Sequence, residues 1–183
     1  MARMAPAGGR AEQLDIKILG IDPGLNITGY GVVEITSQGP RLCEAGVVRG
    51  RSRGSLTARV REIHAGISEV ITALAPDVVA LEELYSHYKR PKTAILMGHA
   101  RGVICLAAAQ ANLAVHHYAA TQIKRIITGS GRAPKSQVQS GISRELGLLE
   151  LPEPVDVSDA LAIALCHYYL SREQGGIVQE KNP

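Results

Sequence analysis

Long apolar runs are missing from this chain, and their absence excludes one class of protein. No segment approaches the run of about 18 apolar residues that a membrane-spanning helix requires. Residues 1–14 also lack the apolar segment of a signal peptide. We therefore expect a cytoplasmic protein without a membrane anchor. A length of 183 residues and an apolar content of 45% fit one compact domain whose core is large enough to fold alone.

Cysteine is also scarce. Cys43, Cys105 and Cys166 are odd in number, far apart and set in apolar surroundings. Their spacing matches no metal-binding motif. These features favour buried free thiols in a reducing compartment over a disulfide framework. A reactive cysteine is the less favoured alternative.

Acidic residues are absent from a long internal segment, between Leu84 and Arg144. The net charge of +3 identifies no partner, because ordinary domains often carry that much. A segment that holds only cations, however, creates a local positive field suited to a polyanion. The alternative is a solvated basic surface. The cations of this segment are Lys89, Arg90, Lys92, Arg101, Lys124, Arg125, Arg132, Lys135 and Arg144.

The pattern of apolar residues predicts one α/β domain at 16–172, with flexible tails at 1–15 and 173–183. Strands are expected at 17–21, 28–35, 42–48, 77–82 and 115–118. Helices are expected at 55–74, 92–112, 121–127, 135–146 and 157–170, the first of them capped by Ser55. Three antiparallel strands followed by strands that alternate with helices indicate a mixed five-stranded sheet flanked by helices.

Asp22 stands where the first predicted strand meets the turn sequence Asp22-Pro23-Gly24. A side chain in this place leaves the core and reaches the end of the sheet, where it is available for chemistry. The simpler interpretation is an aspartate that stabilises its own turn. Both interpretations stay open at this point.

Glu82 ends the apolar run Val78-Val79-Ala80-Leu81, which is typical of a central parallel strand. An ionised carboxylate at the end of such a strand needs a partner or a metal ion. Glu83 points to the opposite face if the strand continues, so only one of the two glutamates can share a site with Asp22.

Asp156 and Asp159 are three residues apart at a helix start, which places both carboxylates on one face of the helix. The alternative is purely structural, with Asp156 as the N-cap and Asp159 in a favourable first-turn position. The residues that follow, Ala160 to Cys166, are apolar on most faces, so this helix is expected to pack within the core. The two acids would then lie near the sheet.

Four carboxylates meet if the two strand ends and this helix start converge. Like charges about 4 Å apart repel by roughly 4 kcal/mol per pair at an effective dielectric of about 20, so such a cluster needs cations. Oxygen ligands suit Mg²⁺ or Mn²⁺. Two such ions about 4 Å apart can activate a water and stabilise the leaving oxygen of a phosphodiester. The pattern therefore predicts a metal-dependent nuclease that acts on DNA.

The order of motifs along the chain resembles the RuvC family of bacterial Holliday junction resolvases, from about Lys17 to Leu170. The match rests on the joint order of several short motifs, each of which is weak alone. These are Gly20-Ile21-Asp22-Pro23-Gly24 with Thr28-Gly29-Tyr30-Gly31, Leu81-Glu82-Glu83-Leu84-Tyr85, Gly98-His99-Ala100-Arg101-Gly102, Pro134-Lys135-Ser136-Gln137-Val138-Gln139 and Asp156-Val157-Ser158-Asp159-Ala160-Leu161-Ala162.

The resemblance implies a ribonuclease H-like fold, a homodimer, and paired symmetric nicks in a four-way DNA junction. It also implies that the protein works in recombination and repair with the branch-migration proteins RuvA and RuvB. By the family's pattern, the catalytic acids that bind Mg²⁺ or Mn²⁺, two ions per site, are Asp22, Glu82, Asp156 and Asp159. Glu82 is thereby chosen over Glu83.

The resemblance also implies residues that contact DNA. Lys124 and Lys135 correspond to basic residues near the scissile strand, and Lys135 could offset charge in the transition state. Tyr85 takes the place of an aromatic that stacks on an unpaired base. From the basic segment we add Lys89, Arg90, Lys92 and Arg132 as expected phosphate contacts.

The chain departs from the family's pattern in three places. Its N-terminal tail is longer than usual, and residues 86–92 are unusually basic and lack an expected asparagine, which leaves the base preference at the cut open. Relatives differ at the position of Asp156, so this residue is either a metal ligand or a base. The preferred metal in vivo and the role of the tail are also open.

Three other functions remain as alternatives. A sugar-kinase or actin-like ATPase also uses an Asp-Gly hairpin, but it closes two such domains, and this chain has neither the length nor a second glycine-rich turn. A non-catalytic junction-binding module would not explain Glu82 at the end of an apolar strand. A related nuclease of the same fold, acting on other nucleic acids, differs in how two active sites are spaced across a dimer.

Overall fold

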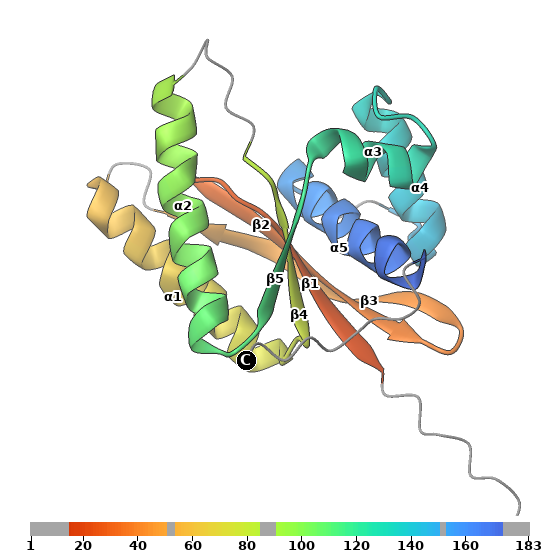
Figure 1. The fold of residues 1–183 in the computed structure, drawn as a ribbon, viewed down its shortest axis with the longest axis horizontal. Coiled ribbons are helices and arrows are strands. Elements are labelled where there is room, and N and C mark those ends of the chain that lie inside the picture. Colours follow the sequence, from red (N-terminus) through yellow and green to blue (C-terminus); the bar gives the residue numbers. More distant parts are fainter. Residues whose placement is uncertain (1–14, 51–53, 85–90, 151–152, 174–183) are drawn as a thin grey trace, which may run out of the picture.

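The computed structural model describes residues 15–50, 54–84, 91–150 and 153–173. Five strands form one sheet, drawn in Figure 1 between two groups of helices. Along the sheet the order is β3-β2-β1-β4-β5. The strands are β1 (Ile16–Asp22), β2 (Ile27–Thr36), β3 (Gly39–Arg49), β4 (Val78–Glu82) and β5 (Ala114–Tyr118). The expected mixed five-stranded sheet is thus confirmed.

Strand direction brings β1 and β4 to a common end. The first three strands form antiparallel pairs, because short turns join them. β4 runs parallel to β1, with Ile21 opposite Leu81, and parallel to β5, with Glu82 opposite Tyr118. The carboxyl ends of β1, β4 and β5 therefore meet at one edge, and the residues that end these strands lie side by side.

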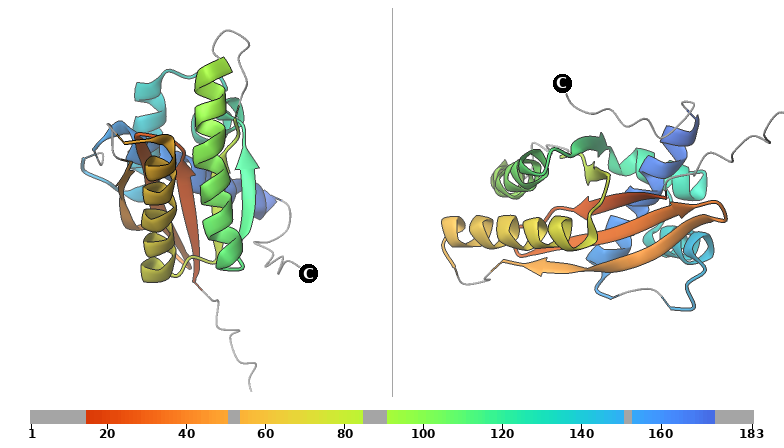
Figure 2. Two further views of the ribbon diagram at one scale, coloured as in Figure 1. Left: turned by 90° about the vertical axis from the view of Figure 1, so that its left-hand side faces the viewer. Right: turned by 90° about the horizontal axis from the view of Figure 1, so that it is seen from below.

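Helices cover both faces of the sheet (Figure 2). α1 (Leu56–Leu74) and α2 (Pro91–Gln110) pack on one face, over a core that includes Ile21, Val79 and Ile63. The Ser55 side chain caps α1 as expected, by accepting a hydrogen bond from the Ala58 amide. α3 (Ala120–Thr128), α4 (Lys135–Leu146) and α5 (Val155–Glu173) pack on the other face.

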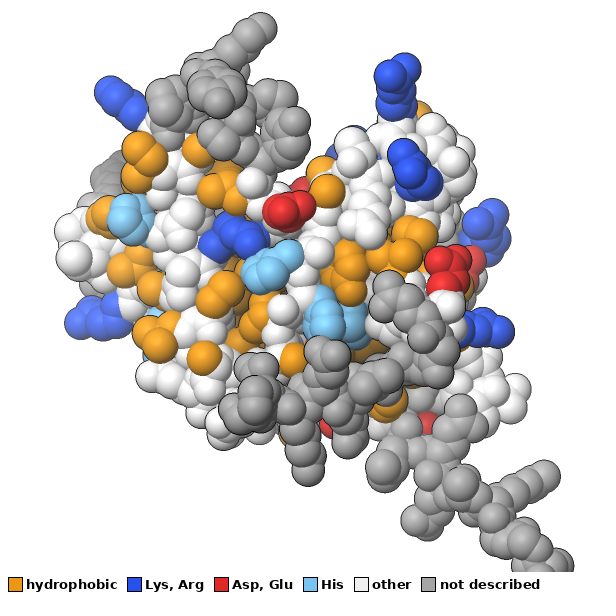
Figure 3. Space-filling view, viewed as in Figure 1, with side chains coloured by type: hydrophobic (Ala, Val, Ile, Leu, Met, Phe, Trp, Pro, Cys, Tyr) orange, Lys and Arg blue, Asp and Glu red, His pale blue; other side chains and the backbone are white. Residues whose placement is uncertain are grey.

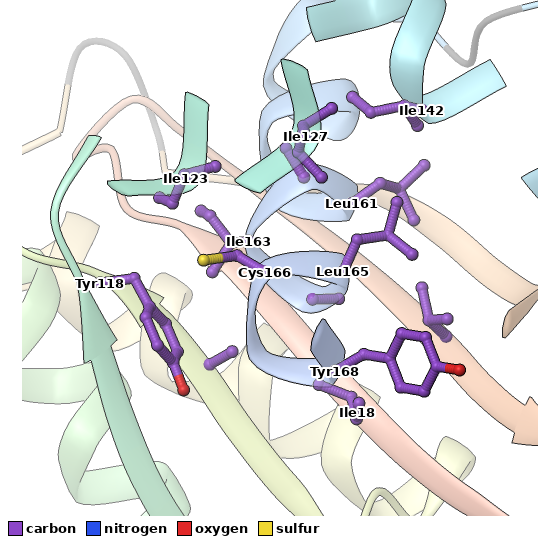
Figure 4. Packing of buried hydrophobic residues seen from close by; sticks show 14 of the residues in the cluster. Ile18, Tyr118, Ile123, Ile127, Ile142, Leu161, Ile163, Leu165, Cys166 and Tyr168 are labelled. Atoms are coloured by element: carbon purple, nitrogen blue, oxygen red, sulfur yellow. The ribbon is translucent and has the colours of Figure 1, made fainter. Parts of the chain in front are cut away.

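α5 is the most buried helix of the part that the structure describes. Every residue from Val157 to Tyr168 except Asp159 is buried. Figure 4 shows Leu161, Ile163, Leu165 and Cys166 of this helix among apolar side chains of α3, α4, β1 and β5. The expectation that the apolar residues after Asp159 lie within the core is confirmed.

Glycines on β1 and β2 let α5 lie directly on the sheet. A Cβ at Gly20 would stand 2.1 Å from the carbonyl oxygen of Ala160, and one at Gly29 would stand 2.1 Å from that of Asp156. Real side chains do not approach so closely, so the helix would have to move away. These glycines fix the distance between the first turns of α5 and the end of β1.

Some sequence-based expectations need correction. α5 begins at Val155 rather than Val157, so Asp156 lies within the helix and is not its N-cap. Cys43 is exposed and Cys105 is half-buried, so only Cys166 fits the prediction of buried thiols. Cys43 lies on β3, which forms one edge of the sheet, where alternate side chains face solvent.

The tails at 1–14 and 174–183 lie outside the described residues. The described helices include none that is long and apolar enough to cross a membrane.

We predict that Gly20→Ala lowers the free energy of unfolding by about 2 kcal/mol, because the added methyl group meets the backbone of α5 rather than a flexible side chain. Denaturant unfolding followed by circular dichroism would measure the change. An unfolding free energy equal to that of the wild type would contradict the close packing of α5 on β1.

Candidate active site

Two carboxylates lie side by side at the carboxyl edge of the sheet. Asp22 is the last residue of β1 and Glu82 is the last residue of β4. Because the two strands are parallel neighbours in matched register, the side chains reach each other and share a hydrogen bond. Glu83 is exposed, and its amide donates a hydrogen bond to the carbonyl oxygen of Tyr118. It does not line the cleft described below.

α5 brings the other two acids to the same edge. Asp159 lines a cleft of about 270 Å³ together with Asp22 and Glu82. Asp156 lies one turn earlier and does not line this cleft, but its charge acts on Asp22. The cleft is lined by Asp22, Glu82, Ala120, Ile123, Lys124, Lys135, Val138, Asp159, Ala162 and Ile163.

Asp22 carries the strongest sign of crowded negative charge. Burial, followed by repulsion from Glu82, Asp159 and Asp156, raises its pKa from 3.8 to about 8. A carboxylate with such a pKa binds a proton at neutral pH unless a cation replaces that proton. This burial among carboxylates distinguishes Asp22 from an aspartate in an exposed turn.

Glu82 is in a different electrostatic environment although it touches Asp22. Burial raises its pKa and the charge of Asp159 adds to the rise, but the hydrogen bond from Asp22 and the positive charges of Arg101 and Lys124 oppose the shift. The proton that the pair shares in the absence of a cation therefore resides on Asp22, which donates it to Glu82.

Lys135 stands opposite these two acids, at the first position of α4. Its ammonium nitrogen donates to an Asp159 carboxylate oxygen at 2.8 Å. Both side chains are partly exposed, so solvent screens this ion pair and its contribution to stability is small. Its importance is positional, because it places a cation at the mouth of the acidic cleft.

The helices that carry the two lysines begin at the cleft. Ala120 of α3 and Lys135 of α4 are first residues and line it. Neither helix has a side chain that caps its first turn, and neither has an acid there. The first amides of each helix, which precede the hydrogen bonds from Gln122 to Ala119 and from Gln137 to Pro134, add positive potential at the rim.

The donor set fits divalent cations. Carboxylate oxygens are the ligands that Mg²⁺ and Mn²⁺ prefer, and the raised pKa of Asp22 is the response of a buried acid cluster without positive charge inside it. Among the residues that the structure describes, no group of three His, Cys, Asp or Glu side chains is arranged so that it could hold a metal ion. The Asp22–Glu82 hydrogen bond and the Lys135–Asp159 ion pair occupy the oxygens that would bind the ions.

The expected DNA contacts are found in different places. Lys124 and Lys135 lie in the cleft. Lys92 is exposed in the first turn of α2, and Arg132 is exposed between α3 and α4; neither lines the cleft. Tyr85, Lys89 and Arg90 lie outside the described residues.

Sequence reasoning did not assign a role to Arg101, whose charge acts on Glu82. Arg101 lies in the acid-free segment and in the motif Gly98-His99-Ala100-Arg101-Gly102, but the pattern of apolar residues does not show that its side chain faces the sheet.

Comparisons with known proteins place this geometry in a family. The model of the family described as crossover junction endodeoxyribonuclease RuvC matches residues 18–167. A protein of Rhodopirellula baltica described in the same words is 60% identical over 156 residues, which cover 84% of this chain and 86% of that protein. At such identity and coverage, the sugar-kinase alternative is excluded.

Solved structures agree. The structure of Thermus thermophilus RuvC is similar with a TM-score of 0.80 and 36% identity, over 87% of this chain and 97% of that one. The same protein in complex with a Holliday junction substrate gives a TM-score of 0.81 and 35% identity, over 87% and 96% of the two chains. The fold is thus ribonuclease H-like, as expected. With the family model and the relative of high identity, these matches establish that the chain belongs to the RuvC family of crossover junction endodeoxyribonucleases.

Proposed function

We propose that this endonuclease cuts four-way DNA junctions with Asp22, Glu82, Asp156 and Asp159 as its metal-binding catalytic acids. The observation that carries the proposal is the buried contact of Asp22 with Glu82 in a cleft that Asp159 also lines, where burial and three neighbouring carboxylates raise the pKa of Asp22 to about 8. Mg²⁺ or Mn²⁺, two ions per site, would be held by these acids. Such ions activate a water and stabilise the leaving oxygen of a phosphodiester.

The residues of the cleft have separate tasks in this reaction. Asp22 and Glu82, the last residues of β1 and β4, would hold the cations, and Asp159 would join them if Lys135 released its carboxylate. Asp156 is either a further ligand or a base, since it lies one turn from Asp159 and outside the cleft lining. Lys135, once free of Asp159, can offset the negative charge that develops on the phosphate.

Positive groups guide the DNA strand to the acids. Lys124 lines the cleft, and α3 and α4 begin at it without a side-chain cap, so their first turns suit a phosphate. Lys92 and Arg132 are exposed cations further out and suit phosphates of the flanking duplex. Lys89, Arg90 and the base-stacking Tyr85 complete the proposed DNA contacts, although they lie outside the described residues.

We further propose that the protein works as a homodimer through α2. Ile95 and Leu106 are 63% and 49% exposed, which is unusual for large apolar side chains on one helix. They share a stripe with Gly98 and Gly102, at which an added Cβ would meet nothing within 4 Å. A second copy of α2 can therefore approach closely and cover the apolar side chains. A dimer would also supply the two active sites that paired symmetric nicks require.

The cellular setting belongs to the same proposal. We expect the protein to act in the cytoplasm in DNA recombination and repair, with RuvA and RuvB as partners by family resemblance. Three free cysteines in the described chain are consistent with a reducing compartment.

Asp22→Asn should abolish cutting while leaving junction binding nearly intact, because it removes a metal ligand but no cation that contacts DNA. We expect the nicking rate to fall by at least about 100-fold. The measurement uses a mobile four-way junction with Mg²⁺, Mn²⁺ or chelator, and a linear duplex of the same sequence. Binding is measured in chelator by electrophoretic mobility.

Asp15→Asn is the matched control, because it makes the same change in an exposed residue just before the opposite end of β1. It should cut at the wild-type rate. Robust cutting by Asp22→Asn would refute the assignment of the acids. Tight junction binding by the wild type without cutting in either metal would instead favour a binding module.

Without divalent cations, Asp22→Asn should also be more stable than the wild type at high pH. The pKa of Asp22 rises from 3.8 to about 8 on folding, so the wild type loses stability as pH increases between these values. The asparagine variant has no such loss. In chelator we expect it to gain roughly 5 kcal/mol at a pH near 8, the free energy that corresponds to this change in pKa, and little at a pH near 4. Denaturant unfolding at both pH values tests this, and an equal difference at both would contradict it.

Leu106→Glu should convert the dimer into monomers, because it buries a charge in the α2 stripe. We expect the dimer dissociation constant to increase at least about tenfold, as measured by analytical ultracentrifugation. Leu149→Glu is the control, since Leu149 is exposed and lies after α4. A dimer of wild-type strength in Leu106→Glu would exclude this face.

A further inference from the structure

Arg101 lies near the edge of the sheet where β1 and β4 end, on the face opposite to α5. It belongs to α2, and its half-buried side chain reaches β5. Figure 3 shows a basic side chain, histidines and an acidic side chain gathered at the middle of the face along which β5 runs. The contact with His117 shows that Arg101 is directed toward β5, and the proposed dimer stripe is made of other residues of the same helix.

The guanidinium holds the end of β5 through His117. Arg101 Nη2 lies 3.0 Å from His117 Nδ1. Because arginine only donates, His117 Nδ1 must accept this hydrogen bond. His117 lies opposite Leu81 of β4. The next residue, Tyr118, lies opposite Glu82, and its carbonyl oxygen accepts a hydrogen bond from the Glu83 amide. The contact is therefore made at the point where the catalytic glutamate leaves the sheet.

Electrostatic attraction also links Arg101 to the end of β4. Glu82 and Glu83 both attract the Arg101 guanidinium, although the sheet directs their side chains to opposite faces. The second terminal nitrogen, Nη1, is buried and has no hydrogen-bond partner among the residues that the structure describes. A buried donor without a partner costs free energy. An apolar side chain would fill the same space without this cost, so the charge of Arg101 needs another explanation.

We infer that Arg101 is a positioning residue for the nuclease reaction, which holds the end of β5 through His117 and counters the negative charge at the end of β4, so that Glu82 stays beside Asp22. The inference rests on the proposed role of Glu82 as a catalytic acid. It separates Arg101 from the cations that contact DNA, because Arg101 acts on Glu82 from behind the cleft and does not line it.

The test compares the full-length wild type with Arg101→Met, Arg101→Lys and His117→Ala. Single-turnover nicking of a mobile four-way junction is measured with protein and Mn²⁺ in excess, and junction affinity is measured in chelator. Unfolding midpoint and sedimentation show that each variant is folded and has the wild-type oligomeric state. Exposed His117 offers a second route if Arg101→Met does not fold.

We expect Arg101→Met to lower the nicking rate at least about tenfold while junction affinity changes less than about twofold, since misplacement of one catalytic group slows the chemical step alone. Arg101→Lys, which keeps the charge, should recover much of the rate. His117→Ala should slow nicking, and the combination with Arg101→Met should be no slower than Arg101→Met alone, as expected for residues that act together.

Two results would overturn the inference while the proposed function stands. One is a wild-type nicking rate in Arg101→Met and in His117→Ala. The other is an unchanged saturated rate with weaker, less salt-dependent binding, which would make Arg101 a phosphate contact. Failure of the proposed function is distinguishable, because the wild type itself would then show no metal-dependent nicking.

Discussion

Backbone contact between α5 and the first two strands is the constraint on which the site depends. Gly20 and Gly29 leave no space for a side chain beneath Ala160 and Asp156, so the first turns of α5 lie directly against the end of β1. The parallel pairing of β1 with β4 then adds Glu82 to Asp22. Three elements that are distant in sequence thus converge on one edge, and the acids they carry are held too close for all of them to stay ionised without cations.

The surroundings of these acids are asymmetric, and this asymmetry organises the cleft. Burial and three neighbouring carboxylates all raise the pKa of Asp22, whereas the positive charges of Lys124, from the cleft side, and Arg101, from the other face of the sheet, lower that of Glu82. Lys135 pairs with Asp159 at the mouth. Positive side chains therefore lie around an acidic centre, an arrangement whose field suits a polyanion at the rim and cations among the acids.

Much of the fold and part of the site could be predicted from sequence because they depend on local patterns. The apolar run before Glu82 predicted a buried parallel strand, and the residues after Asp159 predicted a core helix; both were confirmed. The start of α5 was misplaced because helix ends depend on tertiary contacts as well as propensity. The exposure of Cys43 depends on which strand forms the sheet edge, and the contact of Arg101 with β5 depends on helix packing, so neither follows from periodicity.

A crystal structure with Mn²⁺, in which anomalous scattering locates the ions, tests the central claim most directly. We expect Mn²⁺ between the carboxylates of Asp22, Glu82 and Asp159, with the Asp22–Glu82 hydrogen bond and the Lys135–Asp159 ion pair both broken. Crystals that hold Mn²⁺ elsewhere while both contacts persist would contradict it, because the crowded acids would then be stabilised by a shared proton and a lysine rather than by catalytic cations.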